Sequence, residues 1–169
     1  MSLTSEGGIQ FESVQEEDLP RLNKLVNDLD IVEYLDLIPP VPLATTRMFF
    51  ASVQNGRASW WTIAKKGTII GGVGILPERP DTKLAHSGTM FLYLVKECWG
   101  QGIGGRAVRF ALKEAKRQEL ERVEVMVVDE NERALRLFRR NGFTIEGVKK
   151  EVFNLRGTYH DMVMMARFL

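Results

Sequence analysis

The stretch Phe91 to Gly105, FLYLVKECWGQGIGG, is an apolar run that ends among four glycines, at positions 100, 102, 104 and 105. The next residues, RAVRFALKEAKRQ, place apolar side chains at helical spacing. Four residues without a Cβ clear the turn between strand and helix of side chains, so backbone N–H groups can approach a ligand closely. The unpaired amides and the dipole of the following helix favour an anion. We therefore expect this turn to bind a phosphate group.

Strand-like segments lie on both sides of this turn. Three precede it, SWWTIAKK, GTIIGGVGILP and SGTMFLYLVK, with Lys66-Gly67 as a hairpin turn and the third strand apolar on both faces. VEVMVV follows the glycine helix as a buried strand, which completes a right-handed βαβ unit. The sequence thus predicts an α/β (α+β) fold. Its mixed, mostly antiparallel central sheet has about six to seven strands and is flanked by helices.

The flanking segments complete this fold. Residues 9–14 form a short strand, and LATTRMFFASVQNG forms a helix that stops at Asn55-Gly56. NERALRLFRRNGF is a short amphipathic helix with Asn131 as N-cap and Asn141-Gly142 as stop. Two antiparallel strands, near 144–153 and 158–168, close the chain. The first helix, in EEDLPRLNKLVNDLD, is expected to pack through Leu19, Leu22, Leu25, Val26 and Leu29.

Length and composition restrict the class of protein. The 169 residues suit one domain over 9–169, preceded by a leader over 1–8, MSLTSEGG, that is disordered or was added for expression. With 23 Lys plus Arg against 22 Asp plus Glu, no bulk charge indicates a nucleic acid or membrane partner. One cysteine, Cys98, and two histidines make an internal disulfide or a metal site unexpected. The N-terminus lacks a signal peptide's apolar core, so the expected compartment is the cytoplasm.

Two segments resemble the signature motifs of the GNAT superfamily of acyl-CoA-dependent N-acetyltransferases. The first motif, (Arg or Gln)-x-x-Gly-x-(Gly or Ala), falls on residues 99–104, with Trp99 in place of Arg or Gln. Tryptophan here, and the ending GTYHDMVMM, resemble a branch of ribosomal-protein and small-amine acetyltransferases. The second motif is matched by Asn131, Ala134, Leu137 and Gly142-Phe143.

The resemblance implies that acetyl-CoA binds in a V-shaped opening between the two central parallel strands. Backbone groups of the third strand would pair with the pantetheine arm, and amides of the glycine turn would hold the pyrophosphate. Asn131 would contact the cofactor near its sulfur end or serve only as a helix cap. The implied cofactor-binding residues are Leu92, Leu94, Gly100, Gln101, Gly102, Ile103, Gly104, Gly105 and Asn131.

The implied reaction is direct attack of a primary amine, on a small molecule or a peptide, on acetyl-CoA in a ternary complex. A protonated amine must first lose a proton, and the departing thiolate, of pKa about 8.5, accepts one. Phe138 stands where many members of the family carry a tyrosine as general acid. Tyr93 and Tyr159 are the candidate catalytic substitutes, each with the alternative of a packed or surface tyrosine.

The resemblance also places the acceptor near the loop between the first two helices. Glu33, Tyr34 and Asp36 are the candidate substrate-binding residues there, with a solvated loop as the alternative. The closing strands are compatible with a homodimer. No motif identifies the amine or the length of the acyl chain.

Two rival hypotheses stay open at this stage. Residues 100–105 also fit Gly-x-Gly-x-x-Gly, and Asp129 ends the following strand as the ribose-binding acid of an NAD-binding oxidoreductase does. The antiparallel strands before the turn argue against that fold. The other hypothesis is a non-catalytic CoA-binding homologue, motivated by Phe138 and by the lack of an obvious general base.

Overall fold

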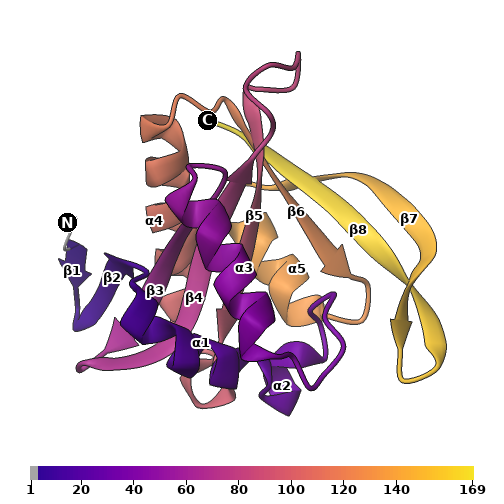
Figure 1. The fold of residues 1–169 in the computed structure, drawn as a ribbon. Coiled ribbons are helices and arrows are strands. Elements are labelled where there is room, and N and C mark those ends of the chain that lie inside the picture. Colours follow the sequence, from indigo (N-terminus) through magenta and orange to yellow (C-terminus); the bar gives the residue numbers. More distant parts are fainter. Residues whose placement is uncertain (1–3) are drawn as a thin grey trace.

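The computed structural model describes residues 4–169. They form one eight-stranded sheet in the order β1-β2-β3-β4-β5-β6-β8-β7, with helices on both faces (Figure 1). The strands are β1 (Thr4–Glu6), β2 (Ile9–Ser13), β3 (Ser59–Lys65), β4 (Thr68–Pro77), β5 (Ser87–Leu94), β6 (Arg122–Val128), β7 (Thr144–Leu155) and β8 (Thr158–Phe168). The α-helices are α1 (Leu19–Val26), α2 (Leu29–Val32), α3 (Leu43–Gln54), α4 (Ile103–Arg117) and α5 (Glu132–Arg140).

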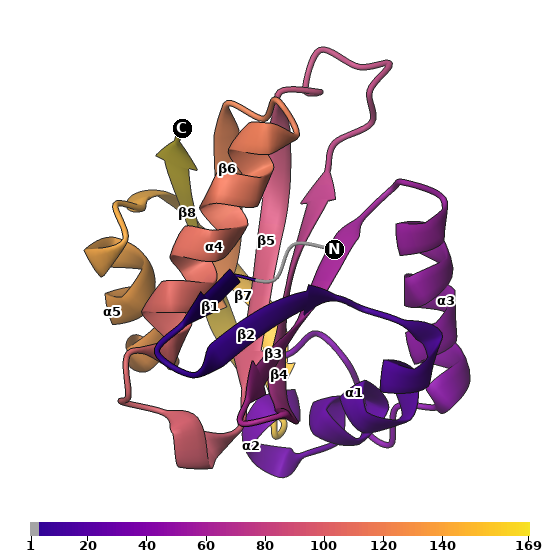
Figure 2. The same ribbon diagram turned by 90° about the vertical axis from the view of Figure 1, so that its left-hand side faces the viewer.

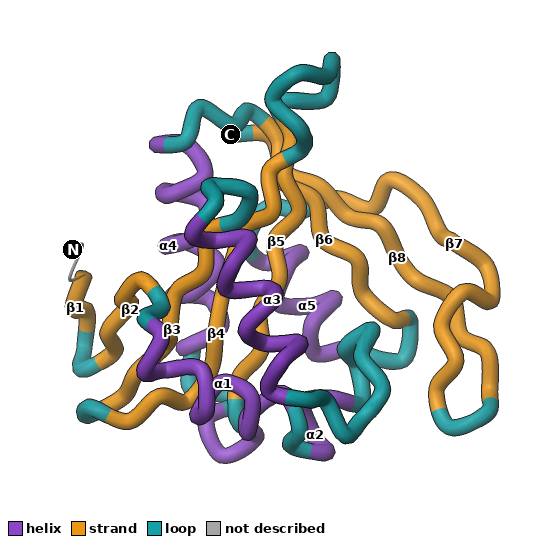
Figure 3. The backbone as a smooth tube through the Cα atoms, in the orientation of Figure 1, coloured by secondary structure: helices purple, strands orange, loops and turns teal. Residues whose placement is uncertain are grey.

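The sheet separates two apolar cores. Figure 2 shows α1 and α3 on one side of the strands and α4 and α5 on the other. The core under α4 includes Val108, Ala111 and Val123, all fully buried. The core under α1 to α3 includes Leu19, Leu22 and Trp60. The β7–β8 hairpin extends along the edge of the molecule beyond these helices (Figure 3).

The two central parallel strands pair over a short distance only. The register of β5 with β6 covers Ser87 to Thr89 opposite Arg122 to Glu124. Beyond this point β5 continues along β4 and β6 continues along β8, both in antiparallel register. The carboxyl ends of β5 and β6 therefore diverge, which produces the V-shaped opening that the resemblance implies.

Glycines of β4 allow aromatic side chains of β5 to lie flat over the neighbouring strand. Gly72 pairs with Tyr93 and Gly74 pairs with Phe91. A Cβ built on Gly74 would lie 2.3 Å from the Phe91 ring and 2.6 Å from the Ser59 backbone oxygen. The two rings stack with centroids 6.3 Å apart. Glycine is therefore required here for close approach between strands.

The predicted fold class is confirmed, and two details differ. Thr4–Glu6 pairs with β2, so part of the expected leader is an eighth strand; residues 1–3 lie outside the described part of the chain. The first helix ends at Val26, and Leu29 is 79% exposed rather than packed. Within residues 4–169 the only parallel pair is β5–β6, which excludes the doubly wound sheet of an NAD-binding fold. None of the described helices has the length and apolarity that spanning a bilayer requires.

We predict that Gly74→Ala destabilises the protein by about 1–3 kcal/mol, because the new methyl group would overlap Phe91 and the backbone of β3. The free energy of unfolding in urea measures this. Gly105→Ala is the matched control: it lies inside α4, where the nearest atom is the mobile end of Arg109, and should stabilise by about 0.5–1 kcal/mol. Equal effects of the two substitutions would contradict the proposed crowding.

Candidate active site

The edge of β5 that borders the opening carries backbone groups that no neighbouring strand pairs. The Val95 N–H donates to the Ile70 carbonyl of β4 at 2.9 Å. Successive residues of a strand direct their N–H and C=O groups to opposite sides, so those of Leu94 and Leu92 point away from β4. Pairing with β6 has already ended at Thr89. The backbone of both leucines therefore faces the opening.

The glycine turn leads from this edge into α4. Gly100 and Gly102 have φ of 71° and 76°, which disfavour any residue with a Cβ. A Cβ at either position would meet nothing within 4 Å, so the space above the turn is open. Gly102 is the N-cap of α4 and no side chain caps the helix. The first amides of α4 are thus available to an anion.

A cavity of about 150 Å³ occupies the opening. It is bordered by β5, β6, the α2 region and the start of α5. Five of the candidate site residues contribute to its lining, namely Leu92, Tyr93, Leu94, Asn131 and Tyr34. Phe138 lines it as well. Asn131 also caps α5, because its Oδ1 accepts from the Ala134 N–H at 3.2 Å. The structure therefore brings the strand edge and the α5 cap to one place.

Trp99 and Arg133 form a pair in this cavity that the sequence did not predict. The Trp99 indole Nε1–H donates to the Leu94 carbonyl at 2.8 Å. The Arg133 guanidinium lies over the indole, 3.1 Å from its centroid, and has no carboxylate within ion-pair distance among residues 4–169. An aromatic ring at the position of the family's Arg or Gln thus fills part of the opening and holds a cation there.

The Tyr93 hydroxyl lies away from this opening. A Cβ built on Gly72 of β4 would be 2.6 Å from the Tyr93 hydroxyl and 3.0 Å from Trp60 Nε1. The ring therefore extends over β4 toward β3, opposite to β6. Trp60 Nε1 and the Tyr93 hydroxyl lie together over Gly72, and within the described chain neither makes a hydrogen bond of normal geometry. Burial raises the pKa of Tyr93, and the nearby Trp60 indole offsets part of this rise.

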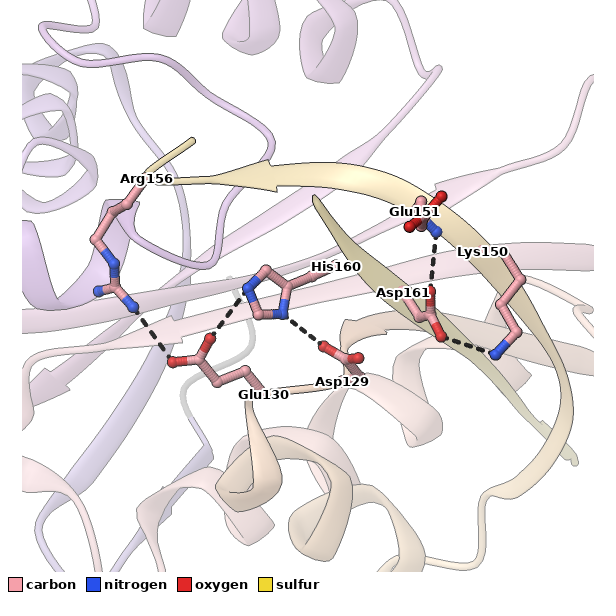
Figure 4. A network of polar contacts seen from close by, with 7 residues as sticks. All are labelled: Asp129, Glu130, Lys150, Glu151, Arg156, His160 and Asp161. Atoms are coloured by element: carbon pink, nitrogen blue, oxygen red, sulfur yellow. Dashed lines mark hydrogen bonds and ion pairs between the residues drawn. The ribbon is translucent and has the colours of Figure 1, made fainter. Parts of the chain in front are cut away.

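A network of charged side chains lies between the β6–α5 turn and the β7–β8 hairpin (Figure 4). The Glu130 carboxylate lies between Arg156, at 3.3 Å, and His160 Nε2, at 3.4 Å. His160 Nδ1 faces Asp129 at 3.1 Å, and Arg156 also pairs with Glu33. The network thus connects the end of α2, the β6–α5 turn and the tip of the β7–β8 hairpin.

The remaining candidates occupy different positions. Partial burial, followed by the negative charge of Glu130, raises the pKa of Tyr34, which lines the cavity. Glu33 points to Arg156 instead of the cavity, Asp36 is exposed, and Tyr159 is 64% exposed on β8. Among residues 4–169, no three His, Cys, Asp or Glu side chains are placed to hold a metal ion.

A diverging parallel strand pair beside an uncapped glycine-rich helix start is the arrangement of acyl-CoA-dependent N-acetyltransferases. The family comparison agrees: the model of the acetyltransferase (GNAT) domain matches residues 9–144. The chain belongs to the GNAT family of acetyltransferases. A search of curated proteins finds no match.

Solved structures share the fold at low sequence identity. A ribosomal-protein-alanine N-acetyltransferase from Brucella melitensis has a TM-score of 0.84 at 23% identity, covering 94% of this chain and 99% of that one. The spermidine N-acetyltransferase from Vibrio cholerae, in complex with CoA and spermine, has a TM-score of 0.86 at 19% identity, with 96% of each chain covered. RimL, a ribosomal L7/L12 N-acetyltransferase in complex with CoA, has a TM-score of 0.84 at 23% identity, with 99% and 97% covered.

We predict that Tyr93→Phe leaves the stability unchanged or raises it at pH 7, because it removes a buried hydroxyl that makes no hydrogen bond of normal geometry. Above pH about 10 the unfolded chain loses the tyrosine proton while the buried group keeps it, so the stability of the wild-type protein falls as the pH rises. Urea unfolding between pH 7 and 11 should show a weaker alkaline loss in the variant. Parallel curves for the two proteins would contradict this account. The exposed Tyr159→Phe is the control.

Proposed function

We propose that this protein transfers an acetyl group from acetyl-CoA to a primary amine by direct attack. The proposal rests on the edge of β5 at Leu92 and Leu94, which β6 does not pair, and which the glycine turn connects to the uncapped start of α4. The extended pantetheine arm of CoA has the polar groups to pair with this edge, and the pyrophosphate joined to it suits the start of the helix. Membership of the GNAT family and the CoA in two structures of similar fold support this donor.

In this proposal the donor is held mostly by backbone groups. The pyrophosphate is bound by amides of residues 101–105, and the arm pairs with Leu92 and Leu94 as an added strand. The Leu94 carbonyl already accepts a hydrogen bond from the indole N–H of Trp99. A carbonyl oxygen has two lone pairs, so the arm either shares this acceptor or displaces the indole. Asn131, at the cavity wall, is the side chain placed to contact the arm.

The chemistry requires no covalent enzyme intermediate. The neutral amine attacks the thioester carbonyl, the C–S bond breaks, and the thiolate of CoA leaves as the amide forms. An N–H of β5 stabilises the developing oxyanion. Phe138 has no proton to donate, Tyr93 is turned toward Gly72, and the hydroxyl at the cavity wall is that of Tyr34. We therefore assign proton delivery to Tyr34 or to water, and removal of the amine proton to water near the carboxylates of the network.

The first test combines calorimetry with a transfer assay. We expect CoA to bind, NADH not to bind, and acetyl-CoA to release free thiol in the presence of a suitable amine. Tyr34→Phe should lower the transfer rate by about 10²-fold or less, the range for one general acid with water as the alternative. CoA binding without transfer to any of a broad panel of amines would favour a non-catalytic CoA-binding protein. Failure to bind CoA would overturn the proposal.

A second test uses the indole as a reporter. Trp60 and Trp61 are buried in the cores, whereas Trp99 lies in the opening. We predict that CoA changes the tryptophan fluorescence, because its arm reaches the Leu94 carbonyl. Adenosine 3′,5′-bisphosphate, which lacks the arm, should leave the signal unchanged. Trp99→Phe should abolish the response to CoA. An equal response to both ligands would contradict the placement of the arm.

A further inference from the structure

A second hollow, here called the α2 groove, lies beside the cavity and has no assigned occupant. It has a volume of about 460 Å³ and lies between α2 with the segment after it and the tip of the β7–β8 hairpin. Its lining is mainly apolar and includes Val32, Leu35, Leu37, Ile38, Phe153 and Leu155. The volume falls in the range of small-molecule sites, roughly 300–1,000 Å³.

The α2 groove is continuous with the candidate active site. Asp30 and Leu35 line both the groove and the cavity at the β5–β6 opening. A molecule whose amine reaches the cavity would therefore extend its body into the groove. This step rests on the proposed function, because the amine is placed by the reaction.

The exposed side chains of the groove favour an apolar body. Ile38 is 90% exposed and Leu29 is 79% exposed, although both are large apolar residues that line the groove. Two such residues beside a concave site form an apolar surface that an apolar ligand would cover. The backbone after α2 contains Pro39 and Pro40, which restrict this segment.

The charges at the rim argue against a second ammonium group. Two carboxylates line the groove, those of Asp30 and Glu33, and each already has a cationic partner in the protein. Asp30 pairs with Lys96 at 3.1 Å, and Glu33 pairs with Arg156, which lines the groove and also contacts Glu130 at 3.3 Å. A polyamine would find no unpaired carboxylate between these two and would meet the Arg156 guanidinium. Desolvating an unpaired cation there is unfavourable.

We propose that the α2 groove binds the acceptor, and that the acceptor is a small primary amine on an aliphatic or aromatic body without a second positive charge. This class differs from the polyamine named for the Vibrio cholerae enzyme of similar fold. Ile38 and its apolar neighbours hold the body, and Arg156 excludes dications.

The test compares two acceptors of equal length, hexylamine and 1,6-diaminohexane. We expect kcat/KM to be about tenfold or more higher for hexylamine, because its far end enters the groove without a charge. A preference for 1,6-diaminohexane or spermidine would overturn the proposal. A leucine-initiated tetrapeptide used better than hexylamine would also overturn it and assign the site to peptide N-termini.

Three variants locate the effect. Ile38→Ser should raise KM for hexylamine about tenfold with kcat little changed. The control is Leu84→Ser, at an exposed residue of the β4–β5 loop, which lies far from α2 (Figure 1). It should change neither KM nor kcat. Arg156→Gln should narrow the preference for hexylamine over 1,6-diaminohexane. Equal KM values for Ile38→Ser and Leu84→Ser would contradict the groove.

A binding measurement separates this inference from the proposed function. Calorimetry of hexylamine and 1,6-diaminohexane on the protein saturated with CoA needs no turnover. Tighter binding of hexylamine, weakened in Ile38→Ser, supports the groove even when transfer is absent. No binding of hexylamine to a complex that holds CoA overturns the inference and leaves the donor site intact.

Discussion

The separation of β5 from β6 is the constraint on which the candidate site depends. β5 is paired with β4 over seven residue positions, from Gly88 to Leu94, but with β6 over three. A free strand edge inside a sheet is costly unless something covers it. Here the indole N–H of Trp99 donates a hydrogen bond to the Leu94 carbonyl, and the first turn of α5 lies across the opening. The same backbone groups, left without a partner strand, are those that suit an extended cofactor arm.

The divergence in turn depends on tight pairing at the other side of β5. Gly72 and Gly74 let the Tyr93 and Phe91 rings lie over β4 rather than into the opening. Phe49 of α3 then packs edge-on against Phe91, with centroids 5.4 Å apart. The aromatic side chains of β5 are thus held on the α1–α3 side, and its backbone edge is left accessible toward β6.

Local features were predicted from the sequence because neighbouring residues determine them. The Lys66-Gly67 turn has φ of 51° and 77°, and Asn131 caps α5, as their residue types indicate. The direction of Tyr93 was not predictable, because strand periodicity gives the face of a side chain but not its lean toward β4. The pairing of Arg156 with Glu33 joins residues 123 positions apart, and no local pattern encodes it. The added strand β1 contains TSE, which has no strand signature.

The distribution of polarity around the opening follows from Phe138. This side chain is 6% exposed and packs edge-on against Phe143, with centroids 5.2 Å apart, so the α5 wall is apolar where a hydroxyl would serve as acid. The hydroxyl in the cavity lining is instead that of Tyr34, in the segment after α2, and Glu130 lies near enough to raise the pKa of that hydroxyl further than burial does alone. A departing thiolate of pKa about 8.5 needs little help to leave near neutral pH, whereas a protonated amine must lose its proton before it can attack. In the proposed reaction, Tyr34 or water therefore suffices for the thiolate, whereas water near the carboxylates of the network serves the more demanding loss of the amine proton.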